Sequence, residues 1–144
     1  MTLEGIRRIC LALPEATEDI KWGQDLCFSV GGKMFVAMNV EPPYQIGFKC
    51  APETFAELTE RDGIIPAPYL ARAGWVQEEE LGSALADEEF APLLRAAYDL
   101  VVERLPKSKR PGGTAKGDAT GAARARSALR RAAARAPRRR AKRR

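Results

Sequence analysis

The stretch LCFSVGGKMFVAMNV, residues 26–40, restricts the fold more than any other part of the chain. Apolar side chains recur with a period of two on both sides of Gly31-Gly32. They are Leu26, Phe28 and Val30 before the glycines and Met34, Val36, Met38 and Val40 after them. This alternation predicts two strands, and paired glycines supply the positive φ angles of a tight turn. The stretch therefore predicts an antiparallel β-hairpin.

A third strand is predicted for QIGFKC, residues 45–50, with Ile46 and Phe48 facing inward and Gln45 and Lys49 facing outward. The segment before the hairpin, PEATEDIKWGQD, is expected to be a polar connector. IIPAPYLARAGW contains two prolines and a glycine, which predicts an irregular crossing that ends in a short strand at Trp75 and Val76.

Three helices are predicted around these strands. The spacing of Leu3, Ile6, Cys10 and Leu13 predicts the first, and PETFAELTERDG predicts a short second one. ADEEFAPLLRAAYDLVVERLP predicts the longest, with Asp87 as its cap and Pro106 at its end. Its buried stripe is expected to be Phe90, Leu94, Ala97 and Val101.

This order of elements predicts an α+β domain over residues 1–106, with an antiparallel sheet that carries its helices on one face. Residues 107–144 are predicted to form a flexible linker and an Arg/Ala-rich tail that is disordered or a nascent helix. The charge changes sign at the same boundary. Met1 to Leu105 hold 18 acidic and 9 basic residues, a net charge of −9, whereas Pro106 to Arg144 hold 15 basic residues and one Asp, a net charge of +14.

A segment with that charge is expected to bind DNA or RNA through phosphate groups. It contains no aromatic or amide side chain that could read base edges, so the binding should ignore sequence. The residues predicted to contact phosphate are Arg130, Arg131, Arg135, Arg138, Arg139, Arg140, Lys142, Arg143 and Arg144.

Catalytic chemistry has little support in the residues. The chain has no histidine, so the usual general base near neutral pH is missing. Its three cysteines lack metal-site spacing and are expected to be small core residues. The acidic run Glu78-Glu79-Glu80 is expected to be solvated surface. We therefore predict no enzyme activity, no metal and no cofactor.

The sequence also predicts neither a signal peptide nor a membrane span, a combination that is typical of a cytoplasmic protein. A monomer is expected.

Six short motifs occur in this order over roughly Leu3 to Pro106: LPEATED, VGGKMF, FKCAPE, GIIPAPYL, GWV and AAYDLVVERLPK. Together they resemble the MmcQ/YjbR family of small bacterial proteins, which are often described as DNA-binding. The resemblance implies an α+β fold with a curved antiparallel sheet, likened to a double-wing DNA-binding motif, and implies no catalytic residues. Family members commonly carry lysines and a histidine before the tryptophan, where this chain has LARAGW with Arg72 alone.

Within the domain, Lys33 at the hairpin tip, Lys49 on the outer face of the third strand and Arg72 are the candidate nucleic-acid contacts. Tyr69 and Trp75 are candidates for stacking on a base. Two hypotheses remain open at this point. In the first, the protein is a non-enzymatic DNA-binding protein whose tail supplies affinity. In the second, the acidic domain recognises a protein or ligand, and the tail is an auxiliary anchor.

Overall fold

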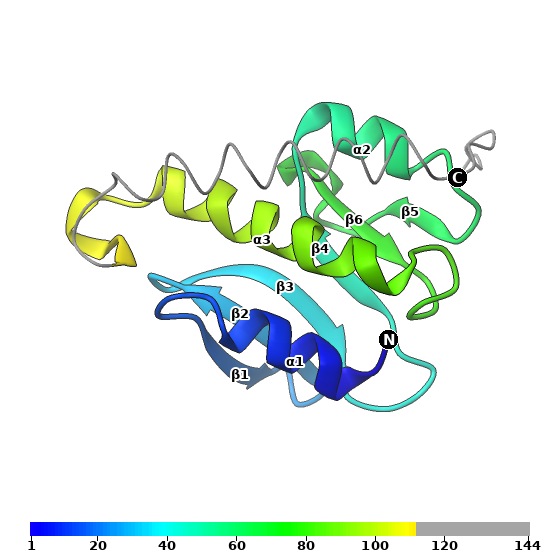
Figure 1. Ribbon diagram of the computed structural model, residues 1–144, viewed down its shortest axis with the longest axis horizontal. Helices are drawn as coiled ribbons and strands as arrows, with labels where there is room; N and C mark the ends of the chain where they lie inside the picture. The colour runs from blue at the N-terminus through cyan, green and yellow to red at the C-terminus, as the bar shows by residue number, and fades with distance from the viewer. Residues whose placement is uncertain (112–144) are drawn as a thin grey trace.

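The computed structural model describes residues 1–111, which form one sheet with helices packed against it (Figure 1). The elements are α1 (Leu3–Leu11), β1 (Thr17–Lys21), β2 (Asp25–Val30), β3 (Lys33–Asn39), β4 (Ile46–Lys49), α2 (Pro52–Leu58), β5 (Ile64–Pro66), the 3-10 helix η1 (Ala71–Ala73), β6 (Trp75–Glu78), α3 (Asp87–Arg104) and the 3-10 helix η2 (Lys107–Lys109). All neighbouring strands pair antiparallel in the order β1-β2-β3-β4-β6-β5. The predicted α+β class is confirmed.

The predicted hairpin is present as β2 and β3, with an irregularity that the alternation did not indicate. Phe28 pairs with Val36, but Ser29 pairs with Met34, so one extra residue on β3 forms a bulge. A bulge reverses the side-chain alternation beyond it. Phe35 is consequently buried in the core, and Met34 lies on the opposite face of the sheet.

Helix α3 covers the buried face of the sheet, where it contacts β2, β3, β4 and α1, while α2 contacts β5 and β6 (Figure 1). The predicted stripe of α3 is confirmed, because Phe90, Leu94, Ala97 and Val101 are all buried. The rings of Tyr98 and Phe35 meet edge to face, with centroids 5.5 Å apart. These contacts join α3 to the hairpin through one apolar core.

Two edge strands were missed by the sequence prediction. β1 lies within the segment expected to be a polar connector, and β5 lies within the expected irregular crossing. Each pairs with only one neighbour, so neither needs the apolar alternation of an inner strand. Pro66 is tolerated at the end of β5 because an edge strand can leave one backbone side unpaired.

The start of α3 also differs from the prediction. Asp87 is the first helical residue and not the cap, and its carboxylate pairs with the N-terminal amine of Met1 at 2.8 Å. The cap position is Ala86, whose backbone N–H donates to the Glu89 carboxylate at 2.9 Å. Alanine has no side-chain oxygen to accept the first-turn N–H groups, and the Glu89 carboxylate instead satisfies the N–H of the cap residue itself.

Glu78 contradicts the expectation that residues 78–80 form a solvated acidic run. Its side chain is fully buried at the end of β6. The carboxylate accepts three backbone N–H groups, from Gly82 at 2.9 Å, Ala84 at 2.9 Å and Leu85 at 2.8 Å. Glu78 therefore organises the loop that leads into α3, and only Glu79 and Glu80 are exposed.

Candidate functional site

The cationic residues predicted as contacts within the domain occupy two separate places. Lys33 is the first residue of β3 and is exposed at the hairpin turn. Lys49 ends β4, and Arg72 lies in η1; both line the same hollow, which does not include Lys33. The structure thus brings two of the three predicted cations together.

Arg104, in the last turn of α3, is a third cation at this hollow and was not predicted. A cation in that position also interacts favourably with the negative end of the helix dipole, which is the only signal the sequence offered for it. We call the site the cationic hollow. It has a volume of about 370 Å³ and is lined by Lys49, Cys50, Ala51, Pro52, Phe55, Ala71, Arg72, Ala73, Gly74, Leu100 and Arg104.

The cationic hollow contains positive charge without a carboxylate to balance it. No Asp or Glu is among its lining residues. The ion pairs within residues 1–111 use Arg7, Arg61, Arg95 and the N-terminal amine, and none uses Lys49, Arg72 or Arg104. Burial lowers the pKa of Lys49, and the nearby positive charge of Arg104 lowers it further. An anion bound here would relieve that repulsion.

The backbone holds Lys49 in place at the edge of this hollow. Its Nζ donates a hydrogen bond to the carbonyl oxygen of Ala73, and its strand position pairs with Trp75. One of the three ammonium protons is used in this bond, which leaves two donors for a ligand. The lysine is therefore oriented before any ligand arrives.

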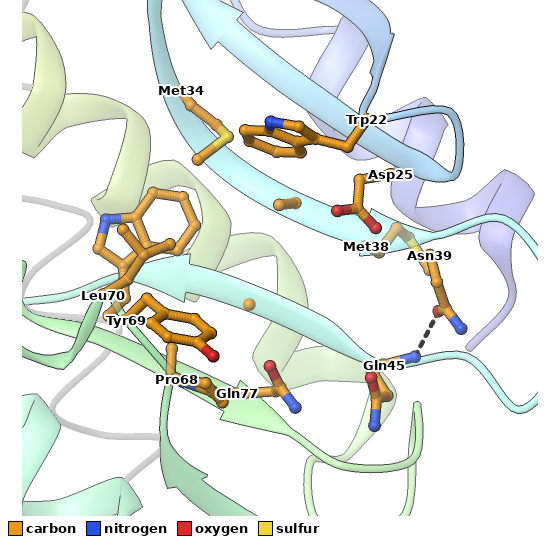
Figure 2. A pocket seen from close by; sticks show the side chains of 14 residues that line it. Trp22, Asp25, Met34, Met38, Asn39, Gln45, Pro68, Tyr69, Leu70 and Gln77 are labelled. Atoms are coloured by element: carbon orange, nitrogen blue, oxygen red, sulfur yellow. Dashed lines mark hydrogen bonds between the residues drawn. The ribbon is translucent and has the colours of Figure 1, made fainter.

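A second hollow of about 420 Å³ lies on the face of the sheet opposite α3 (Figure 2). We call it the aromatic hollow. Its lining residues are Trp22, Asp25, Met34, Ala37, Met38, Asn39, Gln45, Gly47, Ala67, Pro68, Tyr69, Leu70, Trp75 and Gln77. Figure 2 shows Trp22 beside Met34 on one side and Tyr69 beside Leu70 on the other.

Two small residues, Ala37 and Gly47, line the aromatic hollow where β3, β4 and β6 pair. Ala37 pairs with Gly47, and Gly47 pairs with Gln77, so the three lie in one row across β3, β4 and β6. A Cβ on Gly47 would lie 3.4 Å from the Val76 carbonyl oxygen. Glycine and alanine thus leave open a space that larger side chains would fill.

The two predicted stacking residues both line this hollow, but they differ in accessibility. Tyr69 is fully exposed, whereas Trp75 is only 4% exposed and forms part of a wall. Trp22, which the sequence prediction did not select, is 75% exposed on the opposite rim. Trp22 and Tyr69 adopt φ angles of 53° and 68°. The left-handed region is uncommon for bulky residues and is often found at functional sites.

Polar side chains lie along another part of the rim, where Figure 2 shows Asp25, Asn39, Gln45 and Gln77. Asn39 is occupied: its amide donates to the carbonyls of Glu41 and Pro43, and its oxygen accepts the Gln45 backbone N–H. The side chains of Asp25, Gln45 and Gln77 form no such bonds within the described chain and can contact a ligand.

The residues from Arg130 to Arg144 predicted to contact phosphate lie outside the described residues. Within residues 1–111 no cluster of His, Cys, Asp or Glu could hold a metal ion, and no helix is long and apolar enough to cross a membrane. All three cysteines are buried, and burial raises the pKa of the Cys10 and Cys50 thiols to about 12. Such thiols are poor nucleophiles at neutral pH.

Among known protein families, a model described as YjbR matches residues 11–100. The matched range includes every lining residue of both hollows except Arg104. No curated protein matches the chain.

Proposed function

The chain belongs to the YjbR family, and we propose that this member is a non-enzymatic protein that binds DNA through the phosphate backbone. The observation that carries the proposal is the cationic hollow, in which Lys49, Arg72 and Arg104 converge without a carboxylate. In this proposal the hollow docks the domain on a phosphate, and the C-terminal tail supplies most of the affinity.

The position of the cations matters because the domain as a whole is acidic. Residues 1–111 contain 18 acidic and 12 basic side chains, so a randomly oriented domain would be repelled by DNA. In this proposal the three clustered cations overcome the repulsion only when the cationic hollow faces the DNA. Phosphate contacts of this kind fix how a protein lies on the nucleic acid, while they read no sequence.

The tail is proposed to bind through its large number of cations and not through one defined site. Residues 112–144 contain 12 of the 24 Lys and Arg residues of the chain and a single acidic residue, Asp118. Each phosphate that a cation neutralises releases counterions, so affinity depends steeply on salt. If roughly eight to ten cations engage, log affinity should fall against log salt with a slope of about −7 to −9.

A salt titration of DNA binding by fluorescence anisotropy tests both parts. Full-length protein is compared with a chain truncated after Pro111, which keeps η2 and the Arg110 hydrogen bonds to the carbonyls of Glu103 and Leu105. Truncation should remove most of the affinity and most of the salt slope. Unchanged affinity and slope would contradict the role of the tail.

The docking role is tested by Arg72→Gln in the full chain, with Arg8→Gln as the matched control. Arg8 is an exposed arginine on α1 that does not line the cationic hollow. Arg72→Gln should weaken binding and reduce the salt slope by about one, as expected for one lost phosphate contact. Arg8→Gln should behave like the wild type. Equal effects of the two substitutions would show that only total charge matters and would refute the docking site.

A further inference from the structure

We propose that the aromatic hollow receives an unpaired nucleobase while the neighbouring cationic hollow holds its phosphate, so that the domain binds single-stranded nucleic acid in preference to a duplex. The inference rests on the proposed function and specifies which form of nucleic acid the domain prefers. It follows from how the two hollows lie relative to one another and from what lines each of them.

One short segment separates the two hollows. Residues 67–70 line the aromatic hollow, and residues 71–74, which include η1, line the cationic hollow. The segment is anchored on both sides, since the Ala67 N–H donates to the Trp75 carbonyl and the Cys50 N–H donates to the Gly74 carbonyl. A ligand that crosses this segment would occupy both sites at once.

Strand β4 contributes one residue to each hollow, and the separation of these two residues along the strand relates the hollows to one another. Gly47 lies in the floor of the aromatic hollow, and Lys49 lines the cationic hollow. Residues two apart on a strand are separated by ~6.6 Å, and from Lys49 the cationic hollow continues around the end of β4 to Leu100 and Arg104 of α3. That span is comparable with the distance from a base to the phosphate of its own nucleotide. A base above Gly47 would therefore place its phosphate near Lys49 and Arg72.

The aromatic hollow suits a flat ring more than a phosphate. Its floor is made by Ala37 and Gly47, and its rims carry the exposed rings of Trp22 and Tyr69. Base-on-aromatic stacking needs such an accessible ring face and tolerates any base. Asp25, the single charged residue of the lining, would repel a phosphate but can accept an N–H from a base edge.

A duplex cannot make the same contact. Its bases are stacked and paired inside the helix, and taking one out costs free energy that an unpaired strand does not lose. The phosphates of a duplex remain available to the cationic hollow and to the tail. Single-strand preference should therefore depend on the aromatic residues, whereas binding of both forms should depend on the cations.

The test measures affinity of the full chain for one 12-nucleotide strand and for the duplex of the same sequence. Trp22→Ala and Tyr69→Ala should each lower single-strand affinity roughly tenfold and leave duplex affinity unchanged. Ile20→Ala is the control, because Ile20 is an exposed apolar residue on β1 outside the hollow. An oligonucleotide with abasic sites, which keeps its phosphates, should bind the wild type at least as weakly as the intact strand binds Trp22→Ala, because it loses the contacts to both rings.

The outcomes separate this inference from the proposed function. If the wild type binds strand and duplex equally and Trp22→Ala changes neither, the base site is refuted while phosphate binding stands. If no nucleic acid binds at any salt concentration, both proposals fail. A loss of strand and duplex affinity together in Trp22→Ala would also refute the base site, because that result would indicate a general structural effect.

Discussion

Arg61 and Glu89 form a bidentate ion pair inside the domain. Two guanidinium nitrogens of Arg61 donate to the two carboxylate oxygens of Glu89 at 2.9 and 2.8 Å, and the side chains are only 6% and 8% exposed. Arg61 also donates to the Ala84 carbonyl oxygen, and Glu89 accepts the Ala86 N–H. The pair therefore connects the turn after α2 with the start of α3.

Removal of one partner should be strongly destabilising. Arg61→Met leaves the Glu89 carboxylate buried without its counter-ion, which typically costs about 3–5 kcal/mol of unfolding free energy. In the double variant Arg61→Met/Glu89→Met no charge is left uncompensated, so the loss should be smaller than the sum of the single losses. Urea unfolding of the wild type, both single variants and the double variant measures the coupling. Additive losses would contradict the buried pair.

Replacement of Glu78 should also lower the unfolding free energy, although Glu78 forms no ion pair within the described chain. Glutamine keeps the size of the side chain but presents an amide donor where the structure has an acceptor for backbone N–H groups. One or more buried N–H groups would lose their partner, at about 1–3 kcal/mol each. Glu79→Gln, at the exposed neighbour, should leave unfolding free energy nearly unchanged. Similar stabilities of the two variants in urea would contradict this role.

The same carboxyl should give stability a defined pH dependence. Burial raises the pKa of Glu78 above its usual 4.5, and the three N–H donors offset only part of that effect. The native state then holds the proton to higher pH than the unfolded state does. The resulting stabilisation is complete below pH 4.5 and is lost as pH rises through the native pKa. The wild-type unfolding free energy should therefore fall relative to that of Glu78→Gln over this window. A difference that is constant with pH would contradict the raised pKa.

The sequence predicted the parts of the fold in which local pattern and tertiary burial agree. The alternation around Gly31-Gly32 correctly predicted the hairpin, and the spacing of Phe90, Leu94 and Ala97 correctly predicted the buried stripe of α3. β1 and β5 were missed because edge strands have weak alternation and are specified by their neighbours. The bulge that buries Phe35 depends on the register of two strands, which composition does not encode.

Only part of the candidate site was predicted, because residue type can be read from the sequence whereas tertiary proximity cannot. Lys49 and Tyr69 were selected as residue types that suit nucleic acid, and each lines one of the two hollows. Arg104 and Trp22 were missed because they are distant in sequence from those residues and approach them only through the sheet and α3. Glu78 looked like part of a solvated acidic run, since nothing local distinguishes a buried acceptor from its exposed neighbours.

The hairpin turn offers a last test, because its two glycines meet different surroundings. A Cβ on Gly31 would lie 2.5 Å from Leu105 Cδ1, whereas a Cβ on Gly32 would meet nothing within 4 Å. Both glycines have positive φ angles, 59° and 81°, so alanine at either position costs about 1–2 kcal/mol from the backbone. Gly31→Ala should cost about 1–3 kcal/mol more, since it overpacks the contact between the hairpin and the end of α3. Leu105→Ala in the Gly31→Ala background should recover part of that excess. Equal unfolding free energies for Gly31→Ala and Gly32→Ala would show that the turn is independent of α3.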